Sequence, residues 1–342
     1  MTHPLEPRLA AYIAGRMPEA SGVAVSALER ISGGASRETY RFVLDWTESG
    51  AARTRKMILR RDPPASLIDT ERRVEFEAYR AFRGSAVPVP EMLWLEEGDA
   101  ALDHPFFVAE ELCGFQASPQ VLLSGAFDAV LPRIAARKWT ILGEIAKADP
   151  AAVGLTKWME PPSLDSSWKR ELDHWEALID KDQAEPLPIT RAAIRWLRAN
   201  PPPPAQKLSV VHGDFRTGNF LYDAAGEIHG VLDWEMSHLG DPLEDLGWSL
   251  QPVWTFGHAG KAGGLCSPDE AVAIWERASG LKADRAALHW WILFNCVKGQ
   301  GIWVGSAAAF NRGGNKAPIM IYPAWWLINA QDRAMLQVMG RL

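Results

Sequence analysis

Several features are scarce in this chain of 342 residues. It has only three cysteines, Cys113, Cys266 and Cys296, and they are far apart. This spacing excludes a disulfide framework and gives no zinc-ligand pattern. No apolar run reaches the roughly 18 residues typical of a membrane-spanning helix. No motif recurs at the intervals of about 20–50 residues that mark repeat proteins. The chain therefore reads as a reduced, globular protein with no membrane partner.

Basic charge is also scarce. The chain has 36 Lys and Arg residues against 42 Asp and Glu, a net charge of −6 and a pI near 5.8. A broad nucleic-acid surface needs a basic excess, so we expect no nucleic-acid partner. The apolar stretch between Arg8 and Arg16 favours a short amphipathic helix over a signal peptide, because no small-residue cleavage site follows. We expect a cytoplasmic monomer or homodimer.

The first 110 residues show mainly strand patterns. Alternating apolar residues at 40–44 and the apolar segments at 56–61, 91–96 and 105–112 predict strands. A Gly-Gly turn at 33–36 precedes the 40–44 strand, and a helix is predicted over 70–83. Together these elements predict a small antiparallel sheet with one helix.

The rest of the chain shows mainly helical patterns. Helices are predicted at 135–146, 167–181 and 188–199. A strand at 208–211 and a hairpin formed by 220–223 and 228–234 follow, and helices are predicted to fill the remainder. The length suits two units. We predict an α+β fold of two lobes: an N-lobe at 1–110, a connector at 111–114 and a C-lobe at 115–342.

The segment HGDFRTGNFLYD, at 212–223, carries the strongest chemical signal. Asp214 follows an apolar strand, Asn219 precedes the next one, and Asp233 ends the second arm of the hairpin. A hairpin of that length returns its end to its start, so these three side chains should converge. Two carboxylates and an amide oxygen suit Mg²⁺, which in turn suits a polyphosphate. The alternative is that they are ordinary turn residues.

The motifs HGDFRTGN, VLDWE and LGDPLEDL resemble the catalytic core of the aminoglycoside phosphotransferase family. The residues of these motifs are most similar to those of the kinase-like domains found fused to acyl-CoA dehydrogenases. This resemblance implies a protein-kinase-like fold that uses ATP and Mg²⁺. It assigns Asp214 as the catalytic base and Asn219 and Asp233 as metal ligands.

The resemblance also implies nucleotide-binding residues in the N-lobe. Gly33, Gly34 and Ser36 would cover the ATP phosphates. Arg60 would hold the phosphate tail, where most related kinases have lysine and the branch just named commonly has arginine. Arg61 and Lys56 are the alternatives. Its helix partner would be Glu75, with Glu77 as the alternative.

The adenine would be bound by backbone groups of the segment entering the connector, near Glu110, Glu111 and Leu112. Asp245, in the first turn of a predicted helix, is expected to have a structural role and, as a buried aspartate does in related kinases, would brace the catalytic loop. His212 would support the loop through hydrogen bonds, with plain packing as the alternative. Lys298 and Gln300 are candidates to line the acceptor site. Most of the sixteen tryptophans are expected in the core.

The function implied by the resemblance is transfer of the ATP γ-phosphoryl group to a hydroxyl of a small molecule. A hydroxyacyl-CoA or hydroxy acid is the leading acceptor, on family analogy alone. An aminoglycoside, macrolide or choline-type acceptor comes second. A nucleotide-binding pseudoenzyme is the alternative of another class, and the intact Asp214, Asn219 and Asp233 set argues against it.

Overall fold

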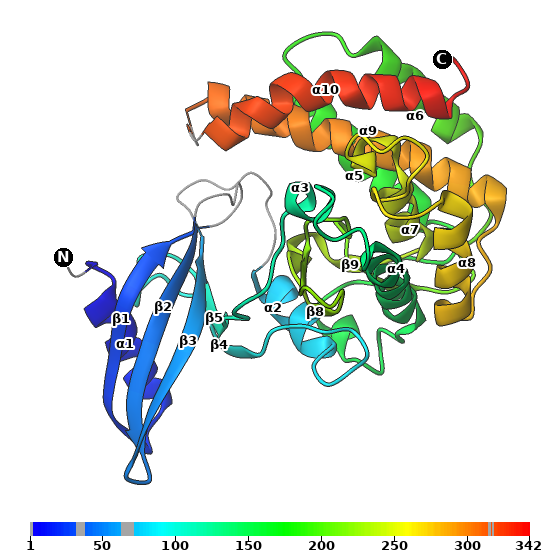
Figure 1. Cartoon of the computed structure of the whole chain (residues 1–342). Coiled ribbons are helices and arrows are strands. Elements are labelled where there is room, and N and C mark those ends of the chain that lie inside the picture. Colours follow the sequence, from blue (N-terminus) through cyan, green and yellow to red (C-terminus); the bar gives the residue numbers. More distant parts are fainter. Residues whose placement is uncertain (1–2, 32–37, 63–71, 314–315, 317) are drawn as a thin grey trace.

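The computed structural model describes residues 3–31, 38–62, 72–313, 316 and 318–342. Its N-terminal part is a five-stranded antiparallel sheet of order β1-β2-β3-β5-β4. The helix α1 precedes the sheet and α2 lies between its third and fourth strands in the chain (Figure 1). These elements are α1 (Glu6–Arg16), β1 (Ala20–Arg30), β2 (Glu38–Glu48), β3 (Ala51–Arg61), α2 (Arg72–Ala81), β4 (Met92–Glu96) and β5 (Phe106–Glu110).

The two faces of this sheet pack against different partners. Leu9 and Ile13 of α1 join Phe42 of β2 and Phe106 of β5 in one apolar cluster. The neighbouring Phe107 points to the other face, where it joins residues of α2 and of the C-lobe. The period-two alternation of a strand thus divides the sheet between a small core under α1 and the main core of the molecule.

The remaining chain is mainly helical (Figure 1). Its elements are α3 (Pro119–Leu122), α4 (Leu131–Lys147), α5 (Ser167–Asp182), α6 (Pro188–Ala199), β6 (Ser209–Val211), β7 (Phe220–Tyr222), β8 (Ile228–Val231), β9 (His238–Gly240), α7 (Leu243–Leu250), α8 (Pro268–Ser279), α9 (Arg285–Asn311) and α10 (Pro318–Val338). The predicted mixed architecture, a small antiparallel sheet followed by a helical lobe, is confirmed.

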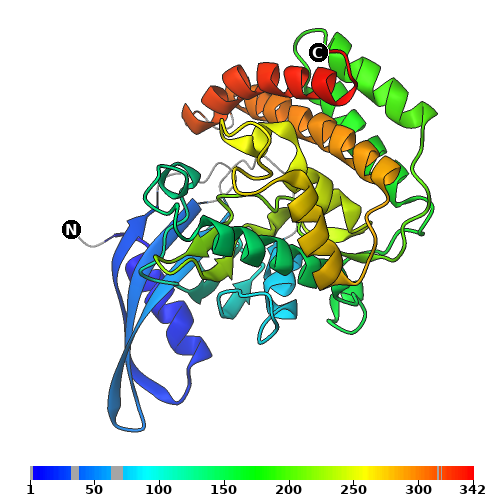
Figure 2. The same cartoon turned by 45° about the vertical axis from the view of Figure 1, so that its right-hand side comes forward.

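The helix α9 is the central support of this lobe. Figure 2 shows it running beside α10, and it also contacts α5, α6 and α7. Most of its residues between Ala287 and Gly301 are buried, as expected for a helix that is apolar on all sides. The helices α4 and α8 pack equally closely, because a Cβ on Gly143 would lie 2.5 Å from that of Ala278.

Three details differ from the sequence prediction. The strands β2 and β3 are longer than the segments 40–44 and 56–61, and pair over their whole length from Glu38–Arg61 to Glu48–Ala51. The described N-terminal residues contain two helices where the sheet unit was predicted with one: α2, and α1 at the short amphipathic helix favoured between Arg8 and Arg16, which packs on the sheet. Residues 238–240 form β9, which pairs with β6, where helices alone were predicted. Three residues are too few for a period-two pattern to be visible.

Within the residues that the structure describes, no helix combines the length and apolar character needed to cross a bilayer.

Lys138 on α4 is fully buried in the apolar core. Among the described residues, no hydrogen-bond acceptor lies within reach of its Nζ atom, which sits 3.6 Å from the centroid of the Trp139 ring. Burial lowers its pKa to about 7. The folded chain therefore binds fewer protons than the unfolded chain between about pH 7 and the ordinary lysine pKa, so this residue makes stability rise with pH across that window.

We expect Lys138→Met to raise the free energy of unfolding at neutral pH by roughly 1–3 kcal/mol, because an unpaired buried amine is costly. The variant should also lose the rise in stability between about pH 7 and 10. Urea unfolding at several pH values measures both effects. Lys147→Met, at an exposed position of the same helix, is the matched control. Equal stability of the Lys138 variant and the wild type would contradict this prediction.

Candidate active site

The loop between β6 and β7, residues 212–219, is held from below by buried polar groups. The backbone N–H groups of His212 and Gly213 donate to the two carboxylate oxygens of Asp245, at 2.6 and 2.9 Å. Gly213 has a φ of 85°, and a Cβ there would lie 2.4 Å from the carbonyl oxygen of Met236. Only glycine fits this backbone position. Asp245 thus braces the loop in the way the sequence predicted.

His212 fixes the next residue. Burial lowers its pKa to about 4, so its ring is neutral. The ring Nε2 lies 2.9 Å from the Leu232 carbonyl, to which it donates, and Nδ1 accepts the backbone N–H of Asp214 at 3.2 Å. The buried imidazole therefore joins the loop to the end of the β7–β8 hairpin and orients Asp214.

The side chains of Asp214 and Asn219 meet at the end of this hairpin. Asn219 Nδ2 donates to Asp214 Oδ2 at 2.7 Å and to the Asp214 carbonyl at 2.9 Å. This orientation turns the amide oxygen of Asn219 away from Asp214. Burial raises the pKa of Asp214 above its ordinary value, while Arg216 opposes the shift and Asp233 adds to it. Asp233 is thus close enough to affect the charge of Asp214.

Asp233 begins the turn after β8 and has left-handed backbone angles, φ 63° and ψ 55°. Such strain in a non-glycine residue is typical of functional sites. Its backbone N–H donates to the hydroxyl of Tyr79 on α2, at 2.9 Å. Burial alone would raise the pKa of Asp233, but Arg60 lowers it below its ordinary value.

Arg60 on β3 lies between three carboxylates. Its Nη1 atom is 2.8 Å from Glu75 Oε1 and 3.0 Å from Asp233 Oδ1, and Nη2 is 3.6 Å from Glu235 Oε2. Glu75 is completely buried. Glu77 instead faces Arg73 and Arg80 on the helix surface. Of the two helix partners considered for Arg60, the structure places Glu75 in contact with it.

Two contacts of Asp214 were not anticipated from the sequence. Trp248 on α7 donates its Nε1–H to Asp214 Oδ1 at 2.8 Å, and Arg216 Nε lies 3.2 Å from the same oxygen. Arg216 is charged and lies two residues after Asp214 in the same motif, so the sequence could have suggested this contact. Trp248 gave no such signal, because tryptophan at a helical position is usually a core residue.

Other predicted site residues lie elsewhere or outside the described part. Gly33, Gly34 and Ser36 fall outside the described residues. The backbone N–H groups of Glu110 and Glu111 donate to the carbonyls of Glu91 and Lys56 within the sheet. Their carboxylates pair with Arg55 and Arg41. Adenine binding near Glu110, Glu111 and Leu112 stays a prediction.

Lys298 and Gln300 are not positioned to line an acceptor site. They are 1% and 0% exposed, in the interior of the C-lobe on α9. The suggestion that they face the acceptor was therefore wrong. The prediction failed because α9, a 27-residue helix, is packed on most sides and therefore buries its polar residues as well.

Together, a five-stranded antiparallel sheet, a helical lobe and a charged site at their junction define a two-lobed kinase-like fold. Residues 27–291 match the model of the phosphotransferase enzyme family, and the chain belongs to that family. By family the chain is therefore a phosphotransferase.

The curated relatives include mouse acyl-CoA dehydrogenase family member 10, which is 28% identical over 214 residues, 57% of this chain. Human acyl-CoA dehydrogenase family member 11 is 23% identical over 272 residues, 76% of this chain. The chain spans 18% of the length of the first relative and 34% of the second.

Solved structures share the fold. A Ralstonia eutropha protein, provisionally described as an aminoglycoside phosphotransferase, has a TM-score of 0.74 at 20% identity over 98% of both chains. The GDP complex of aminoglycoside 2'-phosphotransferase-IIIa has a TM-score of 0.63 at 14% identity, covering 96% of this chain and 98% of that one. A complex of APH(4)-Ia with AMP-PNP and hygromycin B has a TM-score of 0.56 at 20% identity, covering 95% and 98%.

We expect Glu75→Gln to lower the free energy of unfolding by about 2–4 kcal/mol, because it removes one partner of a buried ion pair and leaves Arg60 with less compensating charge. Glu77 on the same helix pairs with Arg73 and Arg80, which are 32% and 55% exposed, so Glu77→Gln should cost less than about 1 kcal/mol. Urea unfolding of the two variants gives the comparison. Equal losses in both would show that the pair with Arg60 does not stabilise the fold.

Proposed function

We propose that the chain transfers the γ-phosphoryl group of ATP to a small-molecule hydroxyl, with Asp214 as the base. The proposal rests on the hydrogen bonds that hold the Asp214 carboxylate and on its exposure to solvent. This carboxylate accepts from Trp248 and Asn219, lies beside Arg216, and its side chain is still 19% exposed. A carboxylate held in one orientation, with a raised pKa and access to solvent, can orient a hydroxyl and accept its proton.

The donor set at the hairpin end fits Mg²⁺. Asn219 turns its amide oxygen away from Asp214, and the Asp233 side chain is 40% exposed. Hard oxygen ligands of this kind suit Mg²⁺, so Asn219 and Asp233 would hold it. Bound there, the ion would supply charge neutralisation for the phosphates. Use of a nucleotide is supported by fold relatives whose complexes contain AMP-PNP or GDP, and the AMP-PNP complex favours ATP.

Arg60 and Arg216 would act on the phosphates. Arg60 is held by Glu75 at 2.8 Å, which keeps its guanidinium beside Asp233. It would hold the phosphate tail of the nucleotide. Arg216 lies next to Asp214 and is 28% exposed, so it would stabilise negative charge on the phosphoryl group during transfer.

For the acceptor, we propose an anionic molecule with an apolar part, such as a hydroxyacyl-CoA or hydroxy acid. Trp248 and Trp254 pack with ring centroids 5.4 Å apart, and Arg216 lies over Trp254 at 5.1 Å. The following segment 254–264 contains His258 and Lys261 but no Asp or Glu. The Arg216 guanidinium beside the base favours an anionic acceptor. Trp248 and Trp254 are 1% and 7% exposed, so they support Asp214 and Arg216 from within the core. Relatives that carry acyl-CoA dehydrogenase names support the same class.

A polycationic aminoglycoside or a choline-type acceptor is the second candidate, supported by the fold relative solved with hygromycin B. Such an acceptor would need carboxylates beside the base, and segment 254–264 supplies none. A pseudoenzyme is disfavoured because Asp214, Asn219 and Asp233 are all present. Cytoplasmic location and a monomeric or homodimeric state stay predictions.

We expect Asp214→Asn to reduce phosphoryl transfer at least about 1,000-fold while the Kd for Mg-ATP changes less than about three-fold, because the base contributes to transfer and not to nucleotide binding. Mass spectrometry of pooled acceptors with Mg-ATP would identify the product. The pools are 4-hydroxyacyl-CoAs, hydroxy acids, aminoglycosides, macrolides, choline and amino sugars. Wild-type turnover in the variant would remove Asp214 from the mechanism. Binding of Mg-ATP without product in any pool would favour the pseudoenzyme.

We expect Trp248→Phe to move the acidic limb of the pH–rate profile to higher pH. The Nε1–H of Trp248 stabilises the ionised form of Asp214, so its loss raises the Asp214 pKa. Activity falls as the pH drops through that pKa, so the variant should lose activity at a higher pH than the wild type. Trp275→Phe, at a buried tryptophan of α8, is the aromatic control, because it leaves Trp248 and Arg216 beside Asp214 in place. Coincident acidic limbs would contradict the assignment.

A further inference from the structure

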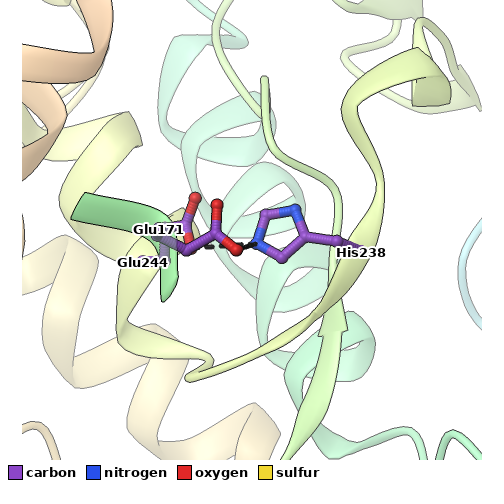
Figure 3. A group of neighbouring side chains, drawn as sticks. All are labelled: Glu171, His238 and Glu244. Atoms are coloured by element: carbon purple, nitrogen blue, oxygen red, sulfur yellow. Dashed lines mark hydrogen bonds and ion pairs between the residues drawn. The ribbon is translucent and has the colours of Figure 1, made fainter. Parts of the chain in front are cut away.

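A second charged cluster lies beneath the catalytic loop, in the interior of the C-lobe. Glu171 of α5, His238 of β9 and Glu244 of α7 point toward one another (Figure 3). The Nε2 atom of His238 lies 3.0 Å from Glu244 Oε2 and 3.7 Å from Glu171 Oε1. Glu244 is completely buried, and the His238 side chain is 21% exposed. Two carboxylates and an imidazole at these distances suit either a metal ion or a shared proton.

The hydrogen bonds of His238 favour the proton. Its Nδ1 lies 3.0 Å from the carbonyl oxygen of Met236, which can only accept. Its Nε2 faces the Glu244 carboxylate, and a metal there would require that nitrogen to be unprotonated. Burial works to lower the pKa of His238, but Glu171 and Glu244 outweigh it and raise the pKa to about 9. The ring is therefore an imidazolium at neutral pH.

Two further cations complete the cluster. Lys298 Nζ lies 3.0 Å from Glu244 Oε1, and Arg170 Nε lies 3.0 Å from Glu171 Oε1. Three positive groups thus face two carboxylates. A divalent ion would add positive charge to a site where the cations already outnumber the carboxylates. The charges of this cluster are therefore balanced by protein side chains, without a metal ion.

Lys298 connects this cluster to the catalytic loop. Its Nζ also donates to the carbonyl oxygen of Gly213, at 2.7 Å. The N–H of the same residue donates to Asp245. Both backbone polar groups of Gly213, its N–H and its carbonyl oxygen, are therefore bound by buried charged side chains. Gly213 directly precedes Asp214. Charge-assisted hydrogen bonds of this kind are roughly twice as strong as neutral ones.

We propose that Lys298 is a positioning residue, oriented by Glu244 and His238, that fixes the backbone preceding Asp214 and so sets the direction of its carboxylate. The proposal rests on the function assigned above for its catalytic consequence, but its structural part stands on these contacts alone. The charged and titratable groups around the cluster are Arg170, Glu171 and His174 on α5, His238 on β9, Asp241 before α7, Glu244 and Asp245 on α7, and Lys298 on α9.

The first test uses the ¹⁵N resonances of the His238 ring in the whole protein. We expect both ring nitrogens to show the protonated, imidazolium signature at neutral pH, unchanged by added Zn²⁺. With a folded pKa near 9, the signature should disappear only as the pH rises through that value. A neutral ring at neutral pH, or resonances displaced by stoichiometric Zn²⁺, would overturn the closed ionic cluster and favour a metal site.

The second test removes the contact to Gly213. Lys298→Met alone would leave the buried Glu244 without one of its cations and could unfold the protein. The double variant Lys298→Met/Glu244→Gln removes both charges of the pair, so that the loss of the contact to Gly213 is measured in a folded protein. We expect the double variant to remain folded, while the amide of Asp214 exchanges its hydrogen at least about ten-fold faster than in the wild type. Lys282→Met, an exposed lysine also paired with a glutamate, is the control. Unchanged exchange at Asp214 in a folded double variant would refute the positioning role.

The kinetic consequence is tested separately. With an acceptor from the screen above, the double variant should lose at least about ten-fold in kcat with little change in the Kd for Mg-ATP, since only the base is misplaced. Normal kcat would overturn the catalytic part of the proposal. If no acceptor is found, the function proposed for the chain fails, while the ring resonances and the amide exchange still decide the role of Lys298.

Discussion

The contact between Arg60 and its carboxylates connects the two lobes. The guanidinium is 12% exposed and lies against Glu75 of α2 and Asp233 at the end of the β7–β8 hairpin. Burying such a charge is unfavourable unless several opposite charges surround it. The sheet, α2 and the hairpin must therefore meet at this point. Tyr79, which accepts the Asp233 N–H, adds a second link between α2 and the hairpin.

The other constraint is the support of the catalytic loop. Three helical residues of the C-lobe reach it from below: Asp245 and Trp248 on α7 and Lys298 on α9. They hold the Gly213 N–H, the Asp214 carboxylate and the Gly213 carbonyl. A loop fixed by buried polar groups on a packed helical core keeps its geometry without a ligand, which is the preorganisation that phosphoryl transfer needs.

The sequence predicted the parts of the site that lie close together along the chain. Asp214, Asn219 and Asp233 belong to one strand–loop–hairpin unit, so turn geometry and strand length were enough to bring them together. The pairing of Arg60 with Glu75 depended on the register of α2, which family resemblance left open between Glu75 and Glu77. The structure resolves it because Glu75 faces the sheet and is buried, while Glu77 faces Arg73 and Arg80.

The sequence by itself determined the class of fold and the place of the candidate catalytic loop at 212–219, because these depend on local patterns and motifs. Only the tertiary structure decided which distant residues complete the site. Trp248 lies 34 residues from Asp214, and Lys298 lies 85 residues from Gly213. No periodicity relates positions so far apart. Their contacts depend on how α7 and α9 pack, and packing follows from the shape of the whole core rather than from any one segment.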